Sequence, residues 1–379
     1  MSLLPSVSLR SMGEPLIVYG TDASYYTGKL EAYLRAKGIA YRLEPFGEAN
    51  MRRCAEHTGV VQVPQVECPD GTWLVDTTLI LEHYERIQPA PAIRPSVASV
   101  RFVSELLEDF ADEWLWRPAM HYRWSFPENA RLMSAWLAEH VAERRAPEFL
   151  KRRYWRRRQL GTFVTGDGVS DATRKVVEGA YLGTLAALEP ILQRRPYVLG
   201  DRPTAADFGF FASLFRHFAC DPVPGRVMRT RSPGVHEWVA RVWNGSPERT
   251  ACGAMPERLP DDLGPLFEIV AAEYLPYLEA NAKAFAAGDA RTRYSIRGVA
   301  FDEPTKPYRV WCRDRLQRAL TALPASERAL VDEAVGAPEA LPSLAVPSPR
   351  PAENVVETLP ITPSAGRRTP VDSWWRPTR

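Results

Sequence analysis

A cluster of short polar side chains precedes a predicted amphipathic helix in the first quarter of the sequence. Asp76, Thr77 and Thr78 stand directly before an apolar run, residues 79–84, whose spacing is helical. Side-chain oxygens at such a position accept hydrogen bonds from the first free N–H groups of a helix. Because a helix start also carries the positive end of the helix dipole, the cluster predicts a binding site for an anionic group.

A proline interrupts the strand that comes before this helix. Residues 61–66 read as a β-branched strand and residues 72–75 as its return, with a Pro-Asp-Gly turn between them. Pro64 lies inside the first strand, where it has no N–H to donate to a neighbouring strand. The backbone N–H and C=O of Val63 are therefore expected to be available to a ligand.

A second helix start carries three hydroxyl side chains near the N-terminus. Residues 16–20 form a short apolar run typical of a buried strand, and a helix is predicted from about residue 24 to residue 37. Ser24 stands at the start of this helix and is followed by Tyr25 and Tyr26. Serine is common at this position simply as a helix cap, so the hydroxyl of Ser24 has a structural interpretation as well as a functional one.

The order of these elements resembles the thioredoxin-like domain of glutathione transferases. A strand near residues 41–46 and a short helix near residues 50–58 complete the pattern. A second stretch, LGDRPTAADF at residues 199–208, resembles the capping-box helix at the centre of the helical domain of that family. The resemblance spans roughly residues 15–246. It implies an α/β thioredoxin-like domain followed by an all-α glutathione transferase C-terminal domain.

The resemblance assigns binding roles to residues at matching positions. In the family the proline is cis, the residue before it pairs through its backbone with the cysteinyl part of glutathione, and an acid–hydroxyl pair at the next helix start holds the γ-glutamyl group. The zeta-type members also contact glutathione through the glutamine of a Gln-Val-Pro sequence. Carried over, glutathione is the expected co-substrate, and its binding residues are Gln62, Val63, Pro64, Asp76 and Thr77.

The resemblance also places Ser24 where serine-type members keep the residue that faces the glutathione sulfur. A free thiol has a pKa near 8.5, and lowering it by about two units requires roughly 2.7 kcal/mol of preference for the thiolate. One hydrogen bond from a hydroxyl to a charged group contributes about 1.5–3 kcal/mol, which is sufficient. Tyr25 occupies the position where the family usually has proline, so Tyr25 or Tyr26 is an alternative source of the hydroxyl.

A proline-rich joint at residues 88–95 leads into a long region of helical periodicity. In the family, the helix that contains Trp114, His121 and Tyr122 forms one wall of the pocket for a hydrophobic electrophile, so these three are the expected pocket residues. Aromatic side chains at helical spacing are more often core residues than ligand contacts, which is the alternative interpretation. Pro118 is expected to kink this helix.

Five segments follow from these patterns. The predicted boundaries are a flexible N-terminus at 1–14, the thioredoxin-like glutathione-binding domain at 15–88, the all-helical domain at 96–250, a helical extension at 256–340 and a disordered proline-rich tail at 341–379. The extension has no counterpart in the common transferase fold. The tail is rich in proline, serine and threonine and has no periodicity, and it includes Trp374 and Trp375.

Composition limits the possible environments and partners. Of the 379 residues 45% are hydrophobic and 25% charged, which is ordinary for a soluble globular protein, and the net charge of +2 favours no class of partner. The five scattered cysteines include no CxxC pair, which indicates a reducing compartment, the cytoplasm, and no metal. No membrane span is expected. The basic segment 144–158 is interpreted as a solvated helix face, so nucleic acid is not an expected partner.

The sequence therefore predicts a glutathione transferase-like enzyme that activates the glutathione thiol for attack on a small hydrophobic electrophile. Glutathione-dependent isomerisation or dehalogenation would use the same nucleophile. The resemblance also implies a homodimer, since members of the family usually form homodimers. The alternative is a non-catalytic binding or assembly module with the same fold, which the basic segment, the extension and the tail favour slightly.

Overall fold

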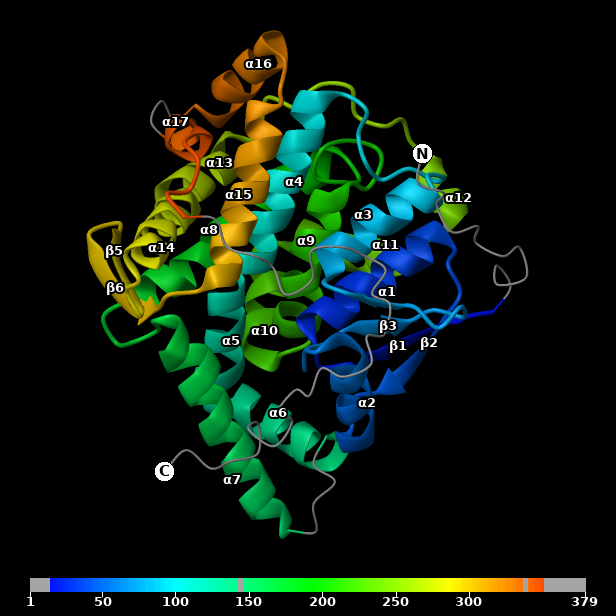
Figure 1. The fold of residues 1–379 in the computed structure, drawn as a ribbon, viewed down its shortest axis with the longest axis vertical. Helices are drawn as coiled ribbons and strands as arrows, with labels where there is room; N and C mark the ends of the chain where they lie inside the picture. The colour runs from blue at the N-terminus through cyan, green and yellow to red at the C-terminus, as the bar shows by residue number, and fades with distance from the viewer. Residues whose placement is uncertain (1–13, 142–145, 337–339, 351–379) are drawn as a thin grey trace.

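The computed structural model describes residues 14–141, 146–336 and 340–350. Its N-terminal part is a small mixed sheet with three helices, on the right in Figure 1. The strands are β1 (Leu16–Gly20), β2 (Tyr41–Pro45), β3 (Gln65–Glu67) and β4 (Trp73–Val75), in the order β2-β1-β3-β4. The helices are α1 (Tyr25–Lys37), α2 (Glu48–Thr58) and α3 (Thr77–Ile87). β1 pairs in parallel with β2 and antiparallel with β3, so this part has the predicted α/β architecture.

The predicted hairpin forms, but its first strand is shorter than the sequence pattern suggests. β3 begins only after Pro64, because a proline has no N–H for the sheet, and the Val63–Pro64 peptide bond is cis. Gly71, at φ +82°, closes the turn into β4. The chain then passes directly into α3, as the polar cluster at residues 76–78 predicts.

A helical domain follows the proline-rich joint, as predicted. Its α-helices are α4 (Ala98–Glu113), α5 (Trp116–Ser125), α6 (Pro127–His140), α7 (Glu148–Gln159), α8 (Arg174–Arg194), α9 (Ala205–Ser213), α10 (Pro222–Arg231), α11 (Pro233–Trp243) and α12 (Pro247–Ala251). Short π-helical segments continue α7 (Leu160–Val164, followed by a 3₁₀ turn at Thr165–Asp167) and α9 (Leu214–Ala219). The kink expected from Pro118 takes the form of a break after Glu113, because a proline cannot donate to the carbonyl four residues earlier, here that of Trp114. Pro118 itself lies in the first turn of α5, where proline is tolerated.

The C-terminal extension packs along the helical domain, in yellow and orange at the upper left of Figure 1. It consists of α13 (Gly264–Ile269), an irregular turn (Val270–Tyr274), α14 (Leu275–Ala287), β5 (Arg291–Ile296), β6 (Val299–Pro304), α15 (Pro307–Thr321), α16 (Ala325–Val335) and α17 (Ala340–Ala345). The extension is therefore not purely helical, because β5 and β6 form an antiparallel hairpin.

One predicted boundary is wrong. The disordered tail was expected from residue 341, but α17 spans this position and the side chains of Leu341 and Leu344 are buried. These two leucines supply enough apolar surface for a short packed helix, which the average composition of the proline-rich segment did not indicate. Residues 351–379, with Trp374 and Trp375, and residues 1–13 lie outside the described part of the chain.

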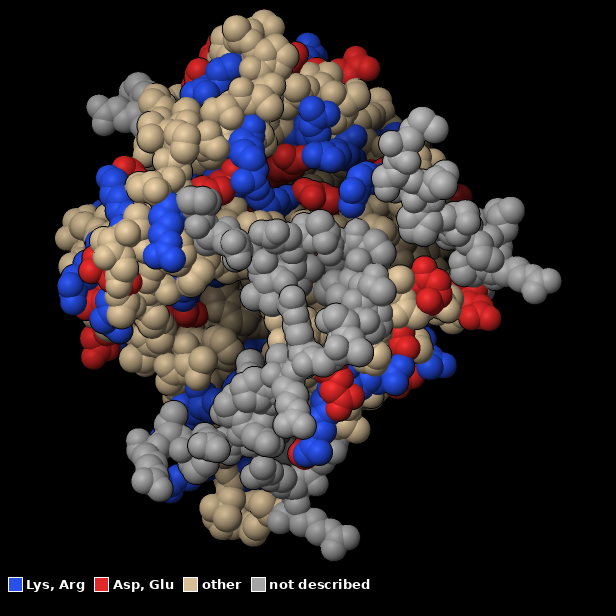
Figure 2. Space-filling view, in the orientation of Figure 1, with Lys and Arg blue, Asp and Glu red and all other residues tan. Residues whose placement is uncertain are grey.

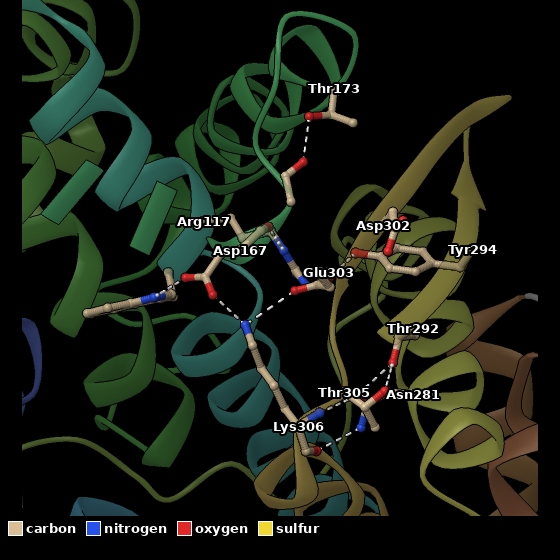
Figure 3. Close-up of polar contacts among 12 residues, drawn as sticks. Arg117, Asp167, Thr173, Asn281, Thr292, Tyr294, Asp302, Glu303, Thr305 and Lys306 are labelled. Carbon is tan, nitrogen blue, oxygen red and sulfur yellow. Dashed lines mark hydrogen bonds and ion pairs between the residues drawn. The ribbon is translucent and has the colours of Figure 1, made fainter. Parts of the chain in front are cut away.

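Buried ion pairs attach the β5–β6 hairpin to the helical domain. Figure 3 shows Lys306 between two carboxylates: its Nζ lies 2.5 Å from Asp167 and 3.2 Å from Glu303. Glu303 also pairs with Arg117 of α5, and both side chains are at most 3% exposed. Asp167 in turn accepts a hydrogen bond of 2.8 Å from the indole of Trp116. Because a buried charge is costly without a partner, this network fixes the hairpin against α5.

None of the helices in the described ranges is long and apolar enough to span a membrane.

On the face of the molecule in Figure 2, basic and acidic side chains are intermixed outside the grey residues, in agreement with the small net charge.

Candidate functional site

A cavity of about 770 Å³ lies where the N-terminal domain, the helical domain and the extension meet. Its wall contains the start of α1, the loop before β3, the start of α3, one face of α5, parts of α6 and α7, and the start of α15. All eight residues predicted to bind glutathione or activate its thiol line this one cavity: Ser24, Tyr25, Tyr26, Gln62, Val63, Pro64, Asp76 and Thr77. The fold therefore brings together three segments that are distant in sequence.

Ser24 caps α1, so its structural interpretation holds. Its Oγ accepts a hydrogen bond of 3.2 Å from the backbone N–H of Thr27. The hydroxyl proton is not used in this bond, because a serine hydroxyl accepts and donates at the same time. Ser24 can consequently cap the helix and still donate a hydrogen bond into the cavity.

The two tyrosine hydroxyls are already engaged as donors. Tyr25 donates to the backbone carbonyl of Ala111, and Tyr26 donates to that of Asp112 at 3.0 Å. Burial raises the pKa of both hydroxyls well above the usual value of 10, so both remain protonated. To serve a thiolate, either tyrosine would have to give up its bond to α4, whereas Ser24 gives up nothing.

The loop before β3 presents backbone groups to the cavity. Val63 and Pro64, which the cis peptide bond joins, both border the cavity. Within the described residues, neither the N–H nor the C=O of Val63 takes part in a hydrogen bond. The side chain of Gln65 fixes the loop from behind, donating to the carbonyls of Val60 at 2.9 Å and Gln62 at 3.2 Å. The loop therefore offers one donor and one acceptor of the kind that a peptide ligand pairs with.

Asp76 caps α3 and faces the cavity with the rest of its carboxylate. Oδ1 accepts from the N–H groups of Thr78 at 3.1 Å and Leu79 at 3.3 Å. Oδ2 accepts from the hydroxyl of Tyr308 at 2.9 Å. Burial raises the pKa of Asp76 above its usual value, while the hydrogen bond from Tyr308 and the charge of Arg315 oppose this shift.

A second buried carboxyl lies beside this pair. Lys29, fully buried in α1, forms ion pairs with Glu108 at 2.6 Å and with Asp112. Burial raises the pKa of Asp112 to about 8, even though the Lys29 ammonium favours its ionised form. Asp112 lines the cavity, so this ion pair lies in the wall of the site.

The remaining wall is largely aromatic, but the residues expected from the sequence are not the ones that form it. On α5 the cavity is lined by Trp116, Met120, Arg123 and Trp124. Further apolar lining comes from Met133, Leu137, Tyr154, Trp155 and Phe163.

Trp114, His121 and Tyr122 do not border the cavity. The indole of Trp114 donates to Glu273 at 3.0 Å, His121 lies 3.0 Å from Glu178, and Tyr122 stacks on Phe126. The helix break after Glu113 changes the helical phase, so Trp116 and its neighbours one and two turns later face the cavity instead.

Among the polar residues of the wall that were not found from the sequence, three come from the extension and from the segment after α9. Tyr308 and Arg309 come from α15 in the extension, and His217 follows α9. Burial holds the pKa of His217 well below its usual value, and the neighbouring Arg123 adds to this. No spacing signal connects these residues with α1 or α3, because they meet only through tertiary packing.

All five cysteines are free thiols. Within the described residues, no group of three or more His, Cys, Asp or Glu side chains is arranged to hold a metal ion.

Two family models match the sequence. Residues 23–87 match the N-terminal domain of glutathione S-transferases, and residues 134–241 match the C-terminal domain of the same proteins. These two segments are therefore the N- and C-terminal domains of the glutathione S-transferase superfamily. The extension that begins with α13 lies outside both matches.

No curated protein matches the sequence, while solved structures do. A glutathione S-transferase from Rhodospirillum rubrum F11 is 18% identical, with 65% of this chain and 96% of that chain covered and a TM-score of 0.41. A beta-etherase from Sphingobium sp. strain SYK-6 is 20% identical, with 60% and 95% covered and a TM-score of 0.41. A glutathione transferase homolog from Drosophila mojavensis with bound glutathione is 16% identical, with 60% and 86% covered and a TM-score of 0.38.

Proposed function

We propose that this protein binds glutathione and activates its thiol for attack on a small hydrophobic electrophile. The observation that carries the proposal is the single cavity lined by the backbone of Val63, the carboxylate of Asp76 and the hydroxyl of Ser24. Val63 would pair with the cysteinyl backbone of glutathione, and Asp76 with Thr77 would hold the γ-glutamyl group at the start of α3. This arrangement brings the sulfur toward Ser24.

Ser24 would stabilise the thiolate by donating its free hydroxyl proton. A hydrogen bond to a charged group contributes about 1.5–3 kcal/mol, which lowers a thiol pKa by about one to two units. The acceptor would lie against the aromatic side chains of Trp116, Trp124 and Trp155, and the apolar wall would favour a hydrophobic electrophile. Isomerisation or dehalogenation would use the same thiolate.

The alternative, a binding module without catalysis, has one specific observation in its favour. Both tyrosine hydroxyls at the site are committed to α4, which leaves Ser24 as the remaining donor among the three hydroxyls predicted to activate the thiol. If Ser24 does not contact the sulfur, the site would bind glutathione without activating it.

The test is a calorimetric titration with glutathione together with thiolate absorbance measured against pH. We expect the wild-type protein to bind and to lower the pKa of the bound thiol. Asp76→Asn keeps an N-cap side chain but loses the charge, so it should weaken binding with little change in stability. If the wild type does not bind millimolar glutathione, the proposal is wrong. Binding with an unchanged thiol pKa would favour the non-catalytic module.

The cellular setting and assembly stay predictions. The free cysteines favour the cytoplasm. A homodimer would have to avoid the surface of α4 that α15 and α16 cover in the same chain.

A further inference from the structure

Two side chains at the start of α15 border the cavity although the extension lies outside both family-matched segments. Tyr308 and Arg309 both line the wall, and the Tyr308 hydroxyl donates to Asp76, 232 positions earlier in the sequence. We propose that the extension is a working part of the glutathione site, in which Tyr308 is a positioning residue that orients the Asp76 carboxylate toward the γ-glutamyl amine. This inference rests on the proposed function.

The hydrogen bonds of Asp76 leave room for one ligand donor. A carboxylate has about four acceptor positions, two on each oxygen. The N–H groups of Thr78 and Leu79 occupy both positions on Oδ1, and Tyr308 occupies one on Oδ2. The remaining position on Oδ2 is available to an N–H of a ligand amine. Tyr308 thus determines which way the free lone pair points.

The backbone of Asp76 also shows that its orientation is imposed. Its φ of 70° lies in the left-handed region, which is uncommon for a residue other than glycine. Such a conformation persists where the surroundings determine it. With this backbone, the Asp76 side chain bonds both to the start of α3 and to Tyr308.

Tyr308 acts as a donor, and Asp76 is surrounded by cations. Burial and the charge of Asp76 raise the pKa of Tyr308 well above the usual value of 10, so its hydroxyl keeps its proton. Burial raises the pKa of Asp76, and the charges of Arg315 on α15 and Lys29 on α1 oppose this shift. The hydrogen bond therefore runs from the Tyr308 hydroxyl to an oxygen of Asp76.

A rigid element presents Tyr308 to the site. Arg309, the next residue, pairs with Glu113 of α4. Two turns after Tyr308, Arg315 pairs with Glu82 of α3. These contacts fix α15 against both domains that form the cavity. A group on a helix held in this way is positioned more accurately than one on a loop.

The experiment compares two tyrosine variants of the full chain. Tyr308→Phe removes the bond to Asp76. Tyr274→Phe is the matched control, because Tyr274 also lies in the extension and also donates to a buried aspartate, Asp109, but neither residue lines the cavity. The Kd for glutathione is measured by calorimetry, with thermal unfolding measured in parallel. We expect Tyr308→Phe to raise the Kd roughly five- to twentyfold and Tyr274→Phe to leave it unchanged.

A glutathione analogue without the γ-glutamyl amino group tests the direction of the contact. If Tyr308 orients Asp76 toward the amine, the Tyr308→Phe penalty should largely disappear with this analogue. If the wild type binds glutathione and Tyr308→Phe binds it with the same Kd, this inference is overturned and the proposed function stays intact. Equal weakening by both variants, or an equal penalty with the analogue, would reveal a purely structural role and also overturn it. Absence of wild-type binding would reject the proposed function and this inference together.

Discussion

The Ser24 hydroxyl has two possible partners, and substitution can separate them. Ser24→Ala removes the cap on the Thr27 N–H and should cost about 1 kcal/mol of stability. It should also raise the pKa of the bound glutathione thiol by roughly one to two units if Ser24 stabilises the thiolate.

Ser24→Asp keeps a capping acceptor but places a negative charge at the sulfur. Its stability should resemble that of the wild type, while the thiol pKa should rise further than in Ser24→Ala. The same thiol pKa in all three proteins would exclude Ser24 as the activating group.

His217 makes stability depend on pH. Its folded-state pKa lies well below 6.5, the usual value, through burial and then Arg123. Below about pH 6.5 the imidazole of His217 therefore binds a proton in the unfolded chain but not in the folded chain. The free energy of unfolding is therefore unaffected by this group above that pH and decreases as the pH falls below it. His217→Phe keeps aromatic contact with Tyr25 and Trp116 but cannot titrate. Urea unfolding should show an acid-side loss that is shallower in the variant, by up to about 1.4 kcal/mol per pH unit. Parallel profiles would contradict the role given to His217.

At the scale of elements, the capping box of α9 supports the helical domain. Asp207 is fully buried and accepts from the N–H groups of Thr204 and Val198, each at 2.9 Å, and from the indole of Trp238 at 3.2 Å. Asp207→Ala leaves these buried donors without an acceptor. The free energy of unfolding should fall by at least about 2 kcal/mol, more than the loss of a cap alone. Asp207 does not line the cavity, so the Kd for glutathione should not change. A variant that melts like the wild type would show that water replaces the carboxylate.

Local signals explain which elements were predictable. The hairpin of β3 and β4, the cap at Asp76 and the capping box at Thr204 each depend on nearby residues of the sequence, and each forms, although β3 is shorter than predicted. The α5 wall was missed because the effect of Pro118 falls four residues earlier, at residues 114–115, whereas a continued helical phase selects Trp114 in place of Trp116. Tyr308 has no signal in sequence at all, since only the folding of the extension brings it to Asp76.

At the scale of the whole molecule, the extension and the cavity share one buried ionic network. Lys306 links Asp167 and Glu303 (Figure 3). Asp167 also accepts a hydrogen bond from the indole of Trp116, which lines the cavity. A change in the extension should therefore reach the aromatic wall. This is a contiguous set of contacts, and its energetic coupling is measurable.

The coupling is tested by neutralising one partner of the network at a time. Lys306→Met leaves two carboxylates that are at most 7% exposed with less compensation, and should cost about 3–5 kcal/mol in urea unfolding. Adding Asp167→Asn removes one of these charges but keeps an acceptor for Trp116, so the double variant should lose about 0.5–3 kcal/mol less than the sum of the single losses.

Arg291→Met is the matched control on the same hairpin, because its pair with Asp302 is about half exposed and should contribute at most about 1 kcal/mol. If Lys306→Met is as mild as Arg291→Met, apolar packing alone attaches the extension. In that case Tyr308 would reach Asp76 through the packing of α15 against α4, and the ionic network would contribute only to the placement of Trp116.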